Sequence, residues 1–88
     1  MIAVNGLVWD DWNRSHLGKH NISPEEVEEV CHGEHQSVES YRKRILIMGE
    51  TKTKKHIAVV LSPEDVSLKP YRDGVYYVVT AFETEVMK

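Results

Sequence analysis

The chain has 88 residues and a formal net charge of -3, with 41% hydrophobic and 28% charged residues. This length suits one small domain with a single modest core, and we predict one domain over residues 1–88. The acidic balance excludes a protein whose whole surface binds nucleic acid, since such surfaces carry an excess of lysine and arginine, but it allows a local basic patch. Cys31 is the only cysteine, so no internal disulfide can form and a reducing cytoplasm is expected.

Membrane contact is not expected from the apolar pattern. Residues 1–8 lack the charged start and the apolar run of a signal peptide. No apolar stretch reaches the length that a bilayer span requires.

A short strand at residues 7–9 and a first helix that ends near His20 are predicted at the start of the chain. Asp10 is placed to cap this helix by accepting a hydrogen bond from the amide of Asn13. Trp12 and Leu17 are expected to point into the core.

The second helix is marked by a stronger signal. Ser23 begins an S-x-x-E capping box with proline at the first helical position, and Ile22 precedes it as a hydrophobic staple on Val27. The helix is expected to end at Cys31 or His32, before Gly33. Its inward residues are predicted to be Val27, Val30 and Cys31.

Strand-like patterns follow the helices. Residues 41–49 and 56–62 are predicted to form an antiparallel hairpin around a polar turn, and residues 75–81 a final strand after a loop rich in turn residues. Two adjacent helices followed by strands predict an α+β domain in which both helices pack on an antiparallel sheet of at least three strands.

Several short motifs occur in a fixed order along the chain. They are W-D-x-x-N at residues 9–13, Lys19-His20, Ile22-Ser23 before an acidic helix, and the strand segments 41–49 and 75–81. This ordered set resembles the BrnT-type toxins, which are ribonucleases with a RelE-like fold. The resemblance implies a cytoplasmic toxin of a prokaryotic type II toxin-antitoxin pair, which cleaves RNA without metal. Its implied partners are RNA and a small antitoxin that neutralises it, with DNA contacted only through that antitoxin.

Cleavage of RNA through its own 2'-hydroxyl needs a base, an acid and cations that stabilise the charge building on phosphate. By the resemblance, the catalytic candidates are Lys19, His20, Arg42 and Arg44. Further RNA-binding candidates are Lys55, His56 and Tyr77. Most of these residues also have a plainer explanation. Lys19 and His20 can be cations at the end of a helix that complement its dipole. The two arginines can be solvated charges on a strand, and Tyr77 can serve the packing of a strand.

Metal or thiol chemistry is weakly indicated. His16 and His20 stand at i and i+4, with Cys31, His32 and His35 as further ligands to consider, but paired cysteines and a telling acidic spacing are missing. We therefore expect neither metal nor cofactor.

The end of the chain departs from the family. BrnT-type toxins usually read Thr-Ala-Arg followed by basic residues, whereas this chain reads Thr80-Ala81-Phe82 and then has Glu83 and Glu85. The departure supports an alternative, a catalytically weak or inactive toxin-fold protein that acts as a protein-binding module.

Overall fold

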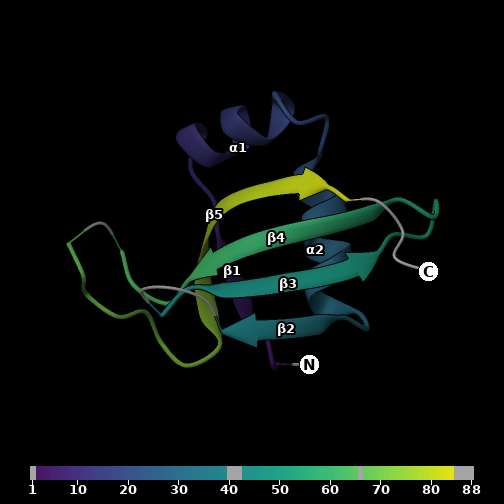
Figure 1. Cartoon of the computed structure of the whole chain (residues 1–88). Helices are drawn as coiled ribbons and strands as arrows, with labels where there is room; N and C mark the ends of the chain where they lie inside the picture. Colours follow the sequence, from purple (N-terminus) through teal and green to yellow (C-terminus); the bar gives the residue numbers. More distant parts are fainter. Residues whose placement is uncertain (1, 40–42, 66, 85–88) are drawn as a thin grey trace.

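The computed structural model describes residues 2–39, 43–65 and 67–84. Within them the chain forms two helices and a five-stranded sheet, which confirms the α+β class (Figure 1). The strand order is β1-β5-β4-β3-β2. The elements are β1 (Gly6–Val8), α1 (Asp11–Gly18), α2 (Pro24–His32), β2 (Gln36–Glu39), β3 (Ile45–Glu50), β4 (His56–Ser62) and β5 (Val75–Glu83).

The sheet is mixed, because β1 runs parallel to β5 while the other pairs are antiparallel. The predicted hairpin of β3 and β4 is confirmed, with Ile47 opposite Val59. Strand β2 was not predicted. It is short and largely exposed, so its sequence lacks a clear alternation of apolar and polar residues.

A bulge in β5 changes which side chains face each side of the sheet. Val60 pairs with Thr80 and Leu61 pairs with Val78, which leaves Val79 as the extra residue of β5. The shift lets Val78 and Ala81 both be buried, although a strict period of two would separate them. Thr80 is thereby placed on the face opposite the core.

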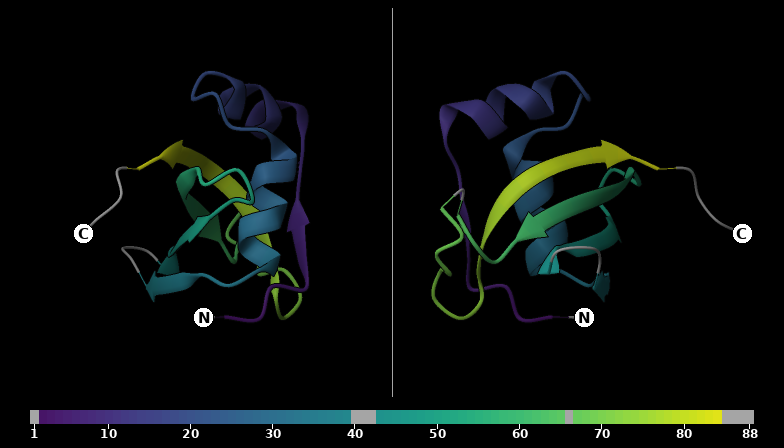
Figure 2. Two further views of the ribbon diagram at one scale, coloured as in Figure 1. Left: turned by 90° about the vertical axis from the view of Figure 1, so that its right-hand side faces the viewer. Right: turned by 60° about the vertical axis from the view of Figure 1, so that its left-hand side comes forward.

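The core lies between α2 and one face of the sheet (Figure 2). The predicted inward positions Leu17, Val27, Val30 and Cys31 are confirmed as buried. The buried core cluster comprises Leu17, Ile22, Val27, Val30, Cys31, Ile47, Ile57, Val59, Leu61, Val78 and Ala81.

Both predicted helix caps are confirmed. The Asn13 amide donates to the Asp10 carboxylate at 2.8 Å, and the Glu26 amide donates to the Ser23 hydroxyl at 3.1 Å. In each case the side chain at the third helical position also accepts from the cap residue's amide, which completes a capping box. Ile22 and Val27 both belong to the core cluster.

The prediction that Trp12 is inward is wrong, because its side chain is 60% exposed. Asn13 takes the inward position instead. Its amide group donates to the carbonyl oxygens of Val8 at 3.0 Å and of Val78 at 3.1 Å, so α1 is fixed beside β1 and β5 by its polar residue. Since Asn13 and Leu17 are four residues apart, their inward side of α1 leaves Trp12 on another side.

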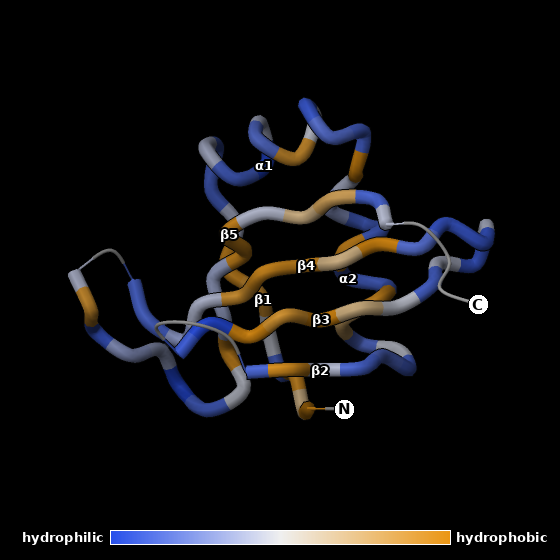
Figure 3. The backbone as a smooth tube through the Cα atoms, in the orientation of Figure 1, coloured by the Kyte–Doolittle hydropathy of each residue, from blue (hydrophilic) through white to orange (hydrophobic). Residues whose placement is uncertain are grey.

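The second face of the sheet has no helix over it within the described chain (Figure 1). Its inner strands β3 and β4 are apolar over much of their length (Figure 3). Val38 and Phe82 are exposed there, at 53% and 40%. We call this side the open face. Among the described residues, no helix is long and apolar enough to cross a membrane.

Candidate functional site

A row of three rings runs along the outer side of α1. Trp12 and His16 are stacked, with ring centroids 4.9 Å apart and planes 7° from parallel. His16 meets His20 edge to face at 5.2 Å. The helix ends at Gly18, earlier than predicted, but the amide of His20 bonds to the carbonyl of Leu17, so the turn carries His20 onto the same side. We call Trp12, His16 and His20 the aromatic row.

The row is anchored to the sheet through His16. Its Nε2 lies 3.0 Å from the Thr80 hydroxyl, which the β5 bulge has placed on the open face. A hydroxyl can donate or accept, so this contact is compatible with either neutral form of the ring. The contact fixes the ring of His16 and leaves its other nitrogen for a further partner.

An open hollow of about 350 Å³ lies against the same side of α1. Its lining residues recur at helical spacing, which places them on one side of the helix. They are Asp11, Trp12, Ser15, His16 and Lys19. Of the predicted catalytic residues, the structure therefore brings Lys19 and His20 to the aromatic row.

Arg44 lies elsewhere. It immediately precedes β3 and is exposed, and the start of β3 lies at the opposite end of the sheet from the end of α1 (Figure 1). The structure thus does not bring Arg44 together with Lys19 and His20. Arg42 lies outside the described residues.

Tyr77 makes a polar contact with the residue that caps the start of α1. Its hydroxyl donates to the Asp10 carboxylate at 3.0 Å. Burial and this hydrogen bond raise the pKa of Tyr77 to about 12. The hydrogen bond from the Asn13 amide holds the pKa of Asp10 below its usual value. Tyr77 is consequently a neutral donor at physiological pH, and it supports the cap of α1.

Lys55 and His56 are both engaged with carboxylates. The Lys55 ammonium lies 3.4 Å from Glu26 and also donates to the carbonyl of Asn21, which ties the hairpin turn to the start of α2. His56 Nε2 lies 2.9 Å from a carboxylate oxygen of Glu50. These contacts offset the positive charge that a phosphate would need from them.

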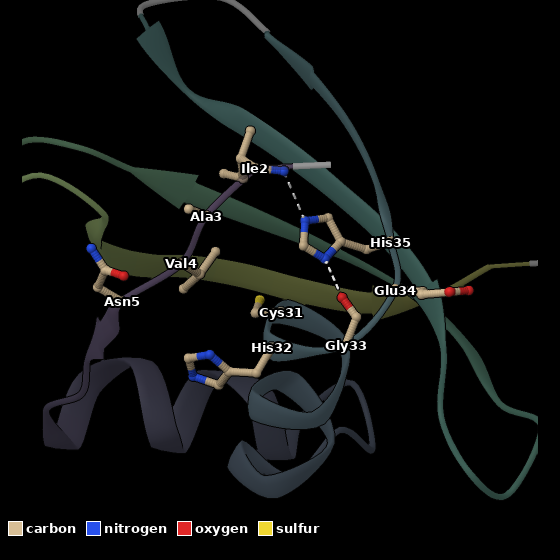
Figure 4. Close-up of a pocket in the computed structure, with 9 residues that line it drawn as sticks. All are labelled: Ile2, Ala3, Val4, Asn5, Cys31, His32, Gly33, Glu34 and His35. Carbon is tan, nitrogen blue, oxygen red and sulfur yellow. Dashed lines mark hydrogen bonds between the residues drawn. The ribbon is translucent and has the colours of Figure 1, made fainter.

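A second hollow, of about 500 Å³, lies between residues 2–5 and the end of α2 (Figure 4). Both nitrogens of His35 are in use there, with Nε2 accepting from the Ile2 amide at 3.3 Å and Nδ1 at 2.9 Å from the Gly33 carbonyl. Burial, assisted by Glu28, raises the pKa of the Cys31 thiol to about 12, so a thiolate nucleophile is disfavoured. Among the described residues, no group of three or more metal-binding side chains could hold an ion.

Comparison of the chain with protein families, with curated proteins and with solved structures found no match. From the sequence, His16 was predicted only as a weak metal ligand. Neither the contact of His16 with Thr80 nor the exposure of Trp12 was predicted. The spacing of Trp12, His16 and His20 was visible in the sequence. Which way that side of the helix faces depends on Asn13 and its distant partners.

Proposed function

We propose that this chain is a metal-independent endoribonuclease, the toxin of a prokaryotic type II toxin-antitoxin pair, acting in the cytoplasm. The supporting observation is the pair of adjacent imidazoles, His16 and His20, on one side of α1 with Lys19 beside them. Imidazoles can take up and release protons under physiological conditions, and an ammonium can stabilise charge on phosphate.

The proposed reaction uses the RNA's own 2'-hydroxyl. One imidazole removes the 2'-hydroxyl proton while the 2'-oxygen attacks phosphorus. The other imidazole, in its protonated form, gives a proton to the departing 5'-oxygen, and a 2',3'-cyclic phosphate remains. Thr80 holds the ring of His16 in place, whereas His20 is exposed. We therefore assign to His20 whichever of the two proton transfers requires the imidazole ring to move. Lys19 stabilises the phosphate charge, and Arg44 contacts a phosphate farther along the RNA.

The implied partners follow the same proposal. A small antitoxin neutralises the enzyme, and DNA is contacted only through that antitoxin. The open face offers an antitoxin exposed apolar side chains, including Phe82.

The test is cleavage of an end-labelled RNA in the presence of a chelator, using folded protein freed of any antitoxin. His16→Ala and His20→Ala should each lower the rate by about 100-fold or more, which is the usual contribution of general acid-base catalysis. His32→Ala is the matched control, because His32 is an exposed imidazole on α2 that contacts Glu28. Equal rates for all three variants would reject this site.

Phe82 gives an independent test. Phe82 stands at the position where the BrnT-type toxins usually have arginine. Wild-type activity should therefore be weak, and Phe82→Arg should increase cleavage. Phe82 is 40% exposed, which leaves room for a longer side chain.

The second candidate function is a protein-binding module without enzyme activity. The exposed Val38 and Phe82 on the open face favour it, because exposed apolar side chains on one face mark interaction surfaces when they form a patch. Undetectable cleavage by both wild type and Phe82→Arg, with and without ribosomes, would favour this candidate.

A further inference from the structure

We propose that the hollow on α1 is a nucleobase subsite selective for guanine in single-stranded RNA. In this subsite the outer ring face of Trp12 stacks on the base and the Asp11 carboxylate reads its edge. The inference deepens the proposed nuclease function by naming the substrate class of the same site.

Trp12 supplies the stacking surface. One face of its indole is covered by His16, yet the side chain is 60% exposed, so the second face is open to solvent. An unpaired base can extend the existing stack by one ring, whereas a base within a duplex has no free face. Such stacking contributes about 5-fold to 150-fold in affinity for each base.

The platform is fixed before any ligand arrives. His16 is positioned by Thr80, and the stack holds Trp12 against it. Little side-chain freedom then remains to be lost on binding. The other tryptophan, Trp9, differs because its indole nitrogen donates to Glu28 at 3.2 Å and its side chain is partly buried.

Asp11 supplies the base selectivity. Its neighbour Asp10 is the helix cap, whereas the Asp11 carboxylate lines the hollow and makes no hydrogen bond or ion pair with the described residues. Guanine presents two adjacent donors, N1–H and the N2 amino group, which match the two oxygens of one carboxylate. Adenine, cytosine and uracil each place an acceptor beside a donor on this edge, so one contact would be repulsive.

Two further residues complete the subsite. Ser15 lies one turn after Asp11, where its hydroxyl can donate to the guanine O6 oxygen. Lys19 lies about 10 Å along the helix from Trp12, at a rise of about 1.5 Å per residue, which suits contact with a phosphate next to the stacked base.

The experiment uses short 2'-O-methyl oligonucleotides of guanine, adenine, cytosine or uracil. These have no 2'-hydroxyl nucleophile, so binding is measured without cleavage. Affinity is read from the anisotropy of a labelled oligonucleotide, and stacking from the quenching of Trp12 fluorescence in a Trp9→Phe background. The guanine oligonucleotide should bind at least about 10-fold more tightly than the others, consistent with one well-matched polar pair.

The variants separate stacking from base reading. Trp12→Leu should weaken binding of all four oligonucleotides by at least about 5-fold. Asp11→Asn should remove the guanine preference, whereas the control Asp73→Asn, an exposed aspartate outside the hollow, should keep it. Unchanged far-ultraviolet circular dichroism confirms that each variant is folded.

Equal affinity for the four bases, absence of binding, or a guanine preference that survives Asp11→Asn would overturn the subsite. Base-selective binding without RNA cleavage by either wild type or Phe82→Arg would keep the subsite and reject the nuclease. Cleavage that depends on His16 and His20, without quenching of Trp12, would reject the subsite and keep the nuclease.

Discussion

Asn13 is the residue on which the placement of α1 depends. It is fully buried, and its side chain makes three hydrogen bonds, two as donor to Val8 and Val78 and one as acceptor from the Asp10 amide. A buried amide that satisfies carbonyls on two strands costs little, whereas the same carbonyls left unpaired are expensive. One polar side chain thus decides which side of α1 faces outward.

Asn13→Ala should lower the free energy of unfolding by about 2 to 4 kcal/mol, because two strand carbonyls and one cap amide lose their partner. Urea unfolding measures the change. Ser15→Ala, an exposed substitution on the same helix, is the control and should have little effect. A loss for Asn13→Ala as small as that of the control would show that water replaces the amide.

At the scale of the element, α2 is defined by its cap and by its contact with β3. The cap is local, since Ser23 and Glu26 satisfy each other's amides across three residues. The packing is long-range, since Gly49 of β3 allows Val30 to approach closely: a Cβ added to Gly49 would lie 2.8 Å from the Val30 side chain. The Ser23 cap therefore stabilises the formation of the helix, whereas Gly49 allows the helix to pack on the sheet.

Ser23→Ala should cost about 1 kcal/mol, the usual contribution of an N-cap hydroxyl. Thermal or urea unfolding can measure this loss. Restoring a cap with Ser23→Asp should recover most of it, because aspartate accepts the same hydrogen bond. A loss that Ser23→Asp does not recover would mean that the hydroxyl has another role.

Val30→Ala should cost about 1 to 3 kcal/mol through lost burial and a residual cavity. Gly49→Ala should also destabilise, by about 1 to 3 kcal/mol, because the new methyl group overlaps Val30. In the double variant the methyl group of residue 49 enters the space that Val30 leaves. The double-mutant cycle should accordingly show a total loss below the sum of the single losses, and strict additivity would contradict this packing.

At the scale of the whole molecule, one ion pair joins the start of α2 to the turn between β3 and β4. Lys55 lies 3.4 Å from Glu26, and both side chains are largely shielded, at 17% and 24% exposed. Burial alone would raise the pKa of Glu26, but the hydrogen bond from the Ser23 amide and the Lys55 ammonium outweigh it and hold the pKa below 4.5. The folded state thus prefers the ionised carboxylate.

A lowered pKa makes stability depend on acidity in one direction. The contribution of Glu26 is fully present above about pH 4.5 and is lost as the pH falls through the lower folded-state pKa. Glu26→Gln keeps the capping hydrogen bond but not the charge, so its unfolding free energy should fall less steeply than that of wild type from about pH 6 to about pH 3. Glu25→Gln, an exposed change on the same helix, should keep the wild-type slope.

Sequence by itself determined the features that depend on neighbours within about four residues. The Asp10 cap, the Ser23 capping box and the buried stripe of α2 depend on such neighbours, and all three were predicted correctly. The β3–β4 hairpin, whose strands are joined by a short polar turn, was also predicted, although β3 begins at Ile45 and not at residue 41. Lys19 and His20 were named from a family resemblance. In the structure His20 belongs to the aromatic row and Lys19 lines the hollow beside it. Their role in RNA cleavage stays a prediction.

Only the tertiary structure decided what joins distant residues. The parallel pairing of β1 with β5 and the contact between His16 and Thr80 both link positions more than sixty residues apart. The bulge at Val79 depends on the register between β5 and β4. Helical spacing placed Trp12, His16 and His20 on one side of α1. Local spacing cannot say which side faces the core, because that choice depends on whether distant carbonyls satisfy Asn13 or distant apolar surface covers Trp12.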